Sequence, residues 1–172
     1  MDSLKERITS LESRFFIQDD IRICPIQDDY DLWYAVVECK LKPGQMDLVN
    51  PAGFSIGRAY LHPECNVPCI IWKGNTRIGY IVLRKWNGSA ATSWSFYLSQ
   101  ERQGFGYGRT AAKIAIHILR AAAPDMPIKL STERTNLKAQ KLYTSLGFRH
   151  EGETDRNDLV FVYRKEFPND IP

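Results

Sequence analysis

Three alternating glycines constrain this chain more than any other feature. They lie in residues 103–109 (QGFGYGR), between a predicted strand that ends at Leu98 and a predicted helix that begins near Gly108. Glycine lets the backbone turn sharply and approach a ligand closely, and the unpaired amides at the start of a helix favour an anion. The segment therefore predicts a strand-to-helix turn that binds an anion such as a pyrophosphate. The alternative is a glycine-rich turn without a ligand.

Two other phosphate-binding loops do not fit this segment. A P-loop ends in Gly-Lys-Ser/Thr after a wider spacing, whereas here the glycines run directly into Gly108-Arg109-Thr110. A dinucleotide-binding fingerprint needs its third glycine at position 109, which is an arginine in this chain. The segment is therefore neither of these two loops.

Hydrophobic periodicity predicts strands and helices on both sides of the loop. Leu4, Ile8, Leu11 and Phe15 recur at helical spacing and predict an amphipathic N-terminal helix over residues 1–17. Further helices are predicted at 28–42, 54–61, 109–123 and 136–146. Strands are predicted at 21–26, 67–72, 77–84, 92–98, 128–132, 148–153 and 159–167, with turns at 73–76, 86–88 and 155–158.

Two of these helices carry distinct patterns. Asp28 and Asp29 offer N-cap oxygens to the first, whose apolar residues are Leu32, Trp33, Val36 and Val37. The helix at 109–123 has a stronger apolar face, formed by Ala111, Ile114, Ala115, Ile118 and Ala122. After the N-terminal helix, the order of elements is β-α-α-β-β-β-α-β-α-β-β. This order predicts an α/β (α+β) protein with a mixed sheet, and it excludes a TIM barrel and an all-β sandwich.

Composition narrows the class of protein. With 172 residues, 44% of them hydrophobic, the chain is expected to form one domain (1–172) with a core of its own. A net charge of +3 is far from that of a nucleic-acid-binding protein, and no apolar run is long enough to span a membrane. Residues 1–16 do not resemble a secretory signal. The four cysteines are widely spread, which indicates reduced thiols in a cytoplasmic protein and no metal site.

A second motif follows the glycine loop by some thirty residues. Residues 135–148 (TNLKAQKLYTSLGF) contain Asn-x-x-Ala-x-x-Leu-Tyr-x-x-Leu-Gly-Phe. Together with Gln-x-x-Gly-x-Gly, this pattern resembles the GNAT superfamily of acetyl-CoA-dependent N-acetyltransferases, over about Ile21 to Val162. Residues 42–60 look further like bacterial diamine and spermidine/spermine acetyltransferases. The resemblance implies a GNAT-type, mostly antiparallel central sheet flanked by helices.

The resemblance also implies roles for particular residues. The edge of the strand before the loop, at Phe96 and Leu98, would pair with the pantetheine arm of acetyl-CoA. Asn136 would contact the same arm, and Tyr143 would lie near the sulfur. The pyrophosphate would be held by the backbone of the loop, formed by Gln103, Gly104, Phe105, Gly106, Tyr107, Gly108, Arg109 and Thr110.

The implied reaction is direct attack of a neutral amine on the thioester. A phenol with a pKa of about 10 can protonate a thiolate whose conjugate acid has a pKa of about 8.5. Tyr143 is therefore predicted to be the general acid, and the alternative is a core aromatic residue. The ammonium form of the substrate must also lose a proton. Glu133, just past a predicted strand, is the candidate base, and the alternative is a solvated turn residue.

Charge is divided along the chain. Residues 101–149 hold nine basic and three acidic side chains, whereas residues 28–64 hold six acidic and three basic ones. This division favours a positive cofactor half and an acidic wall that attracts a cationic amine, although solvated helix faces would give the same counts. We therefore expect acetyl transfer to a primary amine, with a small polyamine or diamine as the first hypothesis.

Other functions and partners stay open at this point. A protein N-terminus, a lysine or an antibiotic amine is an alternative acceptor, and a non-catalytic CoA-binding domain is an alternative to an enzyme. The expected partner is a small-molecule amine, with no nucleic acid and no membrane. The N-terminal helix could pack on the domain or mediate a homodimer.

Overall fold

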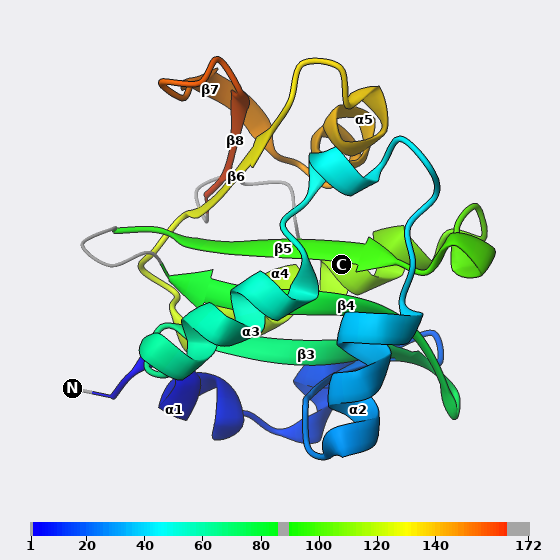
Figure 1. Ribbon diagram of the computed structural model, residues 1–172. Coiled ribbons are helices and arrows are strands. Elements are labelled where there is room, and N and C mark those ends of the chain that lie inside the picture. Colours follow the sequence, from blue (N-terminus) through cyan, green and yellow to red (C-terminus); the bar gives the residue numbers. More distant parts are fainter. Residues whose placement is uncertain (1, 86–89, 165–172) are drawn as a thin grey trace.

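The computed structural model describes residues 2–85 and 90–164 (Figure 1). The turn predicted at 86–88 and the end of the last predicted strand, 165–167, lie outside these residues. The helices are α1 Leu4–Thr9, α2 Asp29–Trp33, α3 Ala52–Leu61, α4 Tyr107–Ala122 and α5 Leu137–Ser145. The strands are β1 Ile17–Gln18, β2 Ile21–Pro25, β3 Asn66–Lys73, β4 Thr76–Lys85, β5 Thr92–Leu98, β6 Ile128–Thr132, β7 Arg149–Glu153 and β8 Leu159–Tyr163.

The described strands form one sheet in the order β1-β2-β3-β4-β5-β6-β8-β7. Every neighbouring pair is antiparallel except β5 and β6, which are parallel and meet only at Thr92 and Ile128. Beyond that pair, β6 turns away from the plane of β3, β4 and β5 (Figure 1). The predicted α/β (α+β) class with a mostly antiparallel sheet is confirmed, and the sheet parts along β5.

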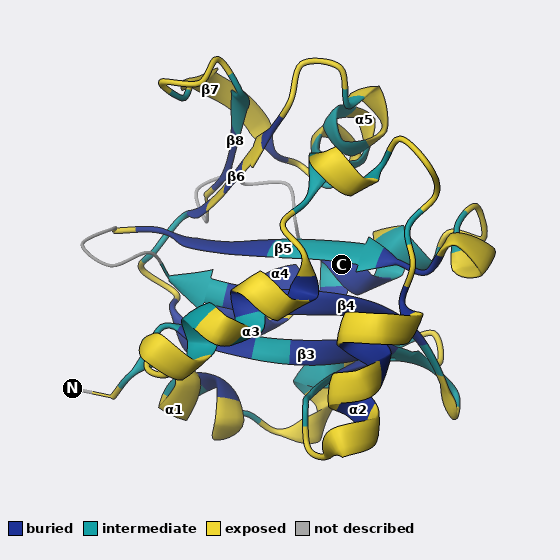
Figure 2. Ribbon diagram, in the orientation of Figure 1, coloured by how far each residue is buried: buried dark blue, intermediate teal, exposed yellow. Residues whose placement is uncertain are grey.

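Helices cover both faces of the sheet. Alternate side chains of β3 and β4 point to opposite faces, so Ile71 and Ile81 pack in the cluster that includes α1 and α4. Ile70 and Val82 pack in the second cluster, against the segment after α2 and the start of α3. The buried central strands lie between these layers in Figure 2. No helix in the described residues is long and apolar enough to cross a membrane.

Helix α4 has the buried face that its sequence predicts. All five residues of the predicted apolar face are buried, and the helix packs along the middle of the sheet. It begins at Tyr107, two residues before the predicted start, because Gly106 at its N-cap has the left-handed φ of +83°. The end of the glycine loop is therefore also the start of the helix.

The N-terminal segment differs from the single helix predicted over 1–17. Helix α1 ends at Thr9, and residues 13–16 form a separate 3-10 turn, η1 Ser13–Phe16, before the short strand β1. The hydroxyls of Thr9 and Ser10 donate to carbonyls of the preceding turn, and such side-chain bonds compete with the continuation of a helix. Leu4 and Ile8 are nevertheless buried against α4, so this segment packs on the sheet.

The helix predicted at 28–42 is present as α2 and a turn that follows it, ending at Glu38, and together they bury a different face from the one that the apolar residues suggest. Leu32, Trp33, Val36 and Val37 are 39–57% exposed. The buried residues are Asp31, Tyr34 and Ala35. Asp31 accepts a hydrogen bond from Arg77 Nε at 2.8 Å, and a single π-helical turn, η2 Tyr34–Glu38, follows α2. The predicted cap is confirmed, because Asp28 accepts from the Asp31 backbone N–H at 2.8 Å.

Candidate active site

A pocket of about 390 Å³ lies where β5 and β6 diverge. Four residues singled out in the sequence line it: Phe96 from β5, Glu133 from the turn after β6, and Asn136 and Tyr143 at the start and middle of α5. The opposite wall is the segment 47–50, which joins the 3-10 turn η3 Met46–Leu48 to α3. Parts of the chain that are distant in sequence thus meet at one site.

Tyr143 lies on the pocket side of a cluster of aromatic rings. Its ring centroid is 5.8 Å from that of Phe148 and 5.7 Å from that of Phe161. Burial raises the pKa of the Tyr143 phenol to about 12. The phenol therefore keeps its proton throughout the neutral range, which a proton donor requires.

Asn136 lines the pocket and also forms a hydrogen bond that caps α5. Its Oδ1 accepts from the backbone N–H of Ala139 at 3.2 Å and so caps α5. The side-chain NH2 group is then the part of Asn136 that can donate to a ligand. The predicted helix at 136–146 is confirmed with this residue as its cap and Gly147, at a φ of +92°, just beyond its end.

Glu133 is exposed at the rim of the pocket, where its Oε2 accepts from the Thr135 hydroxyl at 3.4 Å. Two further carboxylates that the sequence analysis did not single out, Asp47 and Asp158, line the same pocket. Asp47 belongs to the acidic stretch 28–64, and Asp158 ends the predicted turn at 155–158. Nothing in either local pattern pointed to a pocket, because only the fold brings these segments together.

Arginines share the pocket with these carboxylates. Arg84 from β4 and Arg156 line it. Burial, together with the positive charge of nearby Arg58, lowers the pKa of Arg84 to about 10, so its guanidinium is still charged near neutral pH. The pocket therefore carries both signs of charge.

The expected acidic wall is largely absent from this pocket. Of the six acidic residues in 28–64, the pocket lining contains Asp47. Asp31 is buried and paired with Arg77, and Asp28 caps α2. Part of the negative charge of this stretch therefore serves the structure, as a helix cap and as one partner of a buried ion pair.

The glycine loop forms an open cradle at the start of α4. Gly104 and Gly106 have φ values of +90° and +83°, and a Cβ built on either would meet no atom within 4 Å. Helix geometry leaves the N–H groups of Tyr107 and Gly108 without acceptors inside the helix. The loop thus fits the pyrophosphate of acetyl-CoA, since it presents free donors and an approachable backbone.

Two predicted contributors to the cradle are engaged elsewhere. The backbone N–H groups of Arg109 and Thr110 donate to the Gly106 carbonyl at 3.1 and 3.3 Å. The Arg109 guanidinium donates to the Ser145 hydroxyl, and at 3.2 Å to the Ser145 carbonyl. The side chain of Arg109 therefore ties α4 to the end of α5.

Phe105 has an exposed ring that stacks on Tyr107, with centroids 5.6 Å apart. Gly108 faces the other way, toward the strand before the loop. A Cβ there would lie 3.6 Å from the Phe96 ring and 3.7 Å from the Leu98 side chain. Phe96 therefore lies next to α4 as well as lining the pocket.

The backbone of β5 presents part of its edge to the gap in the sheet. The Ser99 N–H donates to Ile78 of β4, whereas the Thr92 N–H donates to Pro127 on the β6 side. Because these directions alternate along an antiparallel strand, the backbone groups of Phe96 and Leu98 point away from β4. The Leu98 carbonyl accepts from Gln103 Nε2 at 3.1 Å, so one of the expected pairing groups is held by the loop itself.

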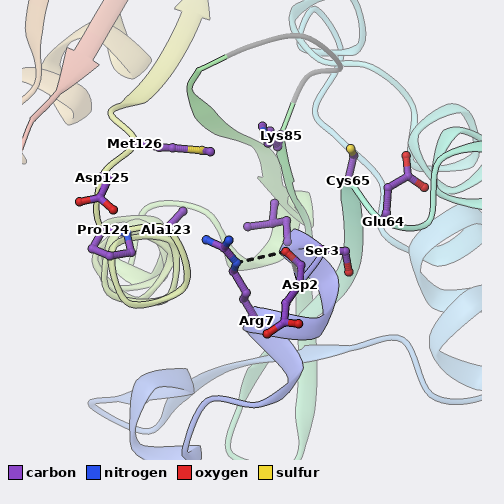
Figure 3. A pocket seen from close by; sticks show the side chains of 11 residues that line it. Asp2, Ser3, Arg7, Glu64, Cys65, Lys85, Ala123, Pro124, Asp125 and Met126 are labelled. Atoms are coloured by element: carbon purple, nitrogen blue, oxygen red, sulfur yellow. Dashed lines mark hydrogen bonds between the residues drawn. The ribbon is translucent and has the colours of Figure 1, made fainter.

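A second pocket, of about 400 Å³, lies near the C-terminal end of α4 (Figure 3). Arg7, Cys65, Lys85 and Met126 are among its lining residues, and it contains none of the predicted site residues. Arg7 donates to the carbonyls of Asp2 at 3.2 Å and Ala122 at 3.4 Å. These bonds tie the N-terminal segment to the end of α4.

The sheet parts between β5 and β6, and the open glycine loop lies at the start of α4. The sequence matches the Acetyltransferase (GNAT) family over residues 31–148. The chain therefore belongs to the GNAT family and is an acetyl-CoA-dependent N-acetyltransferase. No curated protein gives a significant match.

Solved structures share the fold. A spermidine N-acetyltransferase from Vibrio cholerae, in complex with CoA and spermine, is 17% identical with a TM-score of 0.67, over 84% of this chain and 94% of that one. A putative ribosomal-protein-serine acetyltransferase from Vibrio cholerae is 14% identical with a TM-score of 0.68, over 87% and 96%. A dodecameric spermidine N-acetyltransferase from Vibrio cholerae is 16% identical with a TM-score of 0.60, over 84% and 92%.

Proposed function

We propose that this chain acetylates a primary amine in the pocket between β5 and α5, with Tyr143 as general acid. The observation that carries the proposal is that Phe96, Glu133, Asn136 and Tyr143 line one pocket. Acetyl-CoA, when bound, supplies a thioester that a neutral amine can attack. The residues that would hold it are the glycine loop, through its free amides, the edge of β5 at Phe96 and Leu98, and the amide group of Asn136.

In this proposal, the side chains of the protein donate and accept the protons of the reaction. Tyr143 holds a phenolic proton that can pass to the departing sulfur, because its raised pKa keeps it protonated. Glu133 is the proposed acceptor of the ammonium proton, either directly or through a water. Asp47 and Asp158 are the other carboxylates in the lining that could accept it.

A small polyamine or diamine is the first acceptor to test. The pocket lining holds three carboxylates against two arginines, and this small excess of negative charge supports a cationic substrate. One solved structure of the same fold is a spermidine N-acetyltransferase that holds spermine. A protein N-terminus or a lysine is a second class, since another is a putative ribosomal-protein-serine acetyltransferase. An antibiotic amine is a third. We place the activity in the cytoplasm, consistent with the buried thiols of Cys39 and Cys69.

The test is release of free CoA thiol from acetyl-CoA across a panel of amines. The panel comprises spermidine, putrescine, a peptide with a free N-terminus, a lysine peptide and an aminoglycoside. We expect turnover with spermidine above the rate of hydrolysis without amine. CoA binding without turnover of any amine would instead favour the non-catalytic alternative.

A further inference from the structure

Two glutamine side chains join the cofactor loop to the segment that walls the acceptor pocket. Gln103 Nε2 donates to Gln45 Oε1 at 2.9 Å, and Gln45 Nε2 donates to Gln103 Oε1 at 3.2 Å. A backbone bond supports this contact, because the Gln100 N–H donates to the Lys40 carbonyl at 2.8 Å. The two segments are 58 residues apart in the sequence.

Gln103 connects the pair to the proposed cofactor site. It is the first residue of the glycine loop, and its Nε2 also donates to the Leu98 carbonyl at 3.1 Å. One carboxamide therefore contacts both the edge of β5 and Gln45. A ligand that binds along this edge and in the loop would bear directly on the position of Gln103.

Gln45 connects the pair to the acceptor pocket. Its Oε1 accepts from the Lys42 backbone N–H at 3.2 Å, and its carbonyl accepts from the Leu48 N–H at 3.1 Å. These bonds fold residues 42–48 into a compact turn that ends in the wall at 47–50. The wall includes Asp47, one of the three carboxylates of the pocket. A shift of Gln45 would therefore move this wall.

The chemistry of the pair is specific to glutamine. A carboxamide both donates and accepts, so two of them can exchange two hydrogen bonds without bringing a charge into a half-buried site. Alanine loses both bonds, and glutamate keeps only the acceptor. Such bonds are individually modest, which suits a contact that sets a position without being needed for folding.

We infer that Gln45 and Gln103 are positioning residues that couple acetyl-CoA binding to the geometry of the acceptor pocket. The inference rests on the proposed function, and it adds residues that need not touch the reacting atoms. When the loop and the β5 edge are filled, Gln103 is fixed, and the hydrogen-bonded Gln45 holds the wall at 47–50 against α5. The acceptor then meets a wall that is already in place.

The test compares Gln45→Ala, Gln103→Ala and the double variant with the wild-type chain. Spermidine and the panel amine that is turned over fastest serve as acceptors, and the affinity for CoA itself is measured by calorimetry. For Gln45→Ala we expect an acceptor KM about tenfold higher, which is within the usual range of coupling between sites. Its CoA Kd and melting temperature should stay close to the wild-type values.

The other variants separate positioning from a purely structural role. Gln103→Ala should weaken CoA binding as well, because its bond to Leu98 is lost. The rise in acceptor KM in the double variant should be smaller than the two single effects combined, because both changes break the same pair of bonds between Gln45 and Gln103. Gln45→Glu, which keeps one of the two bonds, should fall between wild type and Gln45→Ala. Gln100→Ala is the matched control, because only its backbone N–H takes part.

Two results would overturn the inference while the proposed function stands. One is wild-type turnover with an unchanged acceptor KM in Gln45→Ala. The other is a lower melting temperature in that variant with no change in KM, which would make the pair merely structural. Absence of turnover in the wild-type chain would overturn the proposed function and this inference together.

Discussion

At Tyr143, the packing that holds the side chain also sets its chemistry. The ring lies against Phe148 and Phe161, and burial disfavours the phenolate. A core aromatic residue and a proton donor are therefore compatible descriptions of one side chain. The sequence motif and the position in the pocket lining favour the role of proton donor. That role depends on the phenolic oxygen, whereas core packing depends on the ring.

Tyr143→Phe removes that atom and keeps the ring. Because general acid catalysis contributes about 100-fold or more to a rate, we expect kcat to fall by at least that factor. The affinity for CoA should change by less than about twofold, because other residues are proposed to hold it. Tyr30→Phe is the control, since Tyr30 is 77% exposed on α2. An unchanged kcat would show that Tyr143 is not the donor.

The pH dependence of the rate follows from the raised pKa of Tyr143. A free phenol loses its proton near pH 10, whereas Tyr143 in the folded chain has a pKa of about 12. Below about pH 10, Tyr143 keeps its proton, so its ionisation does not lower the rate in that range. We expect kcat/KM for an amine to rise from pH 6 to 10 as the amine becomes neutral. A descending limb near pH 8 to 9 would assign the proton to another group.

Asp31 can be used to test whether the acidic residues of 28–64 stabilise the fold or bind the substrate. It is buried, and it accepts from both Arg77 Nε and the Gln27 N–H. Asp31→Asn should lower the free energy of unfolding in urea by about 1–3 kcal/mol, because it leaves the Arg77 charge uncompensated. The acceptor KM should not change.

The exposed pair of Glu12 and Arg14 gives the matched control for Asp31→Asn. Glu12→Gln should change the unfolding free energy by less than about 0.5 kcal/mol. A raised acceptor KM in Asp31→Asn without loss of stability would instead indicate that Asp31 contributes to acceptor binding.

Among the elements, the turn from β5 into α4 carries the clearest requirement for glycine. Gly106→Val places a β-branched residue at a φ of +83° and fills the open side of the cradle. We expect CoA binding, measured by calorimetry, to be lost. Gly152→Val is the control for strain alone, since Gly152 has a φ of +108° and open space, in strand β7. Retained CoA affinity in Gly106→Val would contradict the role of the loop.

Elements with strong local signals were predictable from the sequence. The apolar face of α4 and the glycines before it are contiguous in the chain, so periodicity and turn chemistry locate them. The buried face of α2 and the turn after it was not predictable, because it depends on contacts with distant strands: Asp31 pairs with Arg77, 46 residues away, and Tyr34 and Ala35 pack in the second cluster. Local hydrophobicity favours the opposite face, which is exposed in the structure.

Some residues of the candidate site were likewise predictable from the sequence, and others were not. Asn136 and Tyr143 belong to the second motif, and Phe96 lies in the strand just before the glycine loop. All three line one pocket. Arg84 and Asp158 line it as well, yet each lies in a stretch that reads locally as a strand end or a turn. Their place depends on how β4 and the hairpin of β7 and β8 are brought together, which no local pattern encodes.

For the whole molecule, we propose that the chain unfolds as one domain, as its size predicts. Both helical layers pack on one sheet, and α1 is buried against α4. Acetyl-CoA at 100 times its Kd should stabilise the folded chain by about 2.7 kcal/mol. For this length, the melting temperature should rise by about 5–10 °C in a single transition. Two separate transitions, or no rise, would contradict these expectations.

The parting of β5 from β6 has a consequence for the chain in the cell. An arm of acetyl-CoA that lies along β5 would take the place that a neighbouring strand occupies elsewhere in the sheet, and it would cover backbone groups of β5 that point away from β4. Bare strand edges are where other polypeptides add and where aggregates begin. We therefore expect bound acetyl-CoA to shield this edge of β5 from unwanted strand addition.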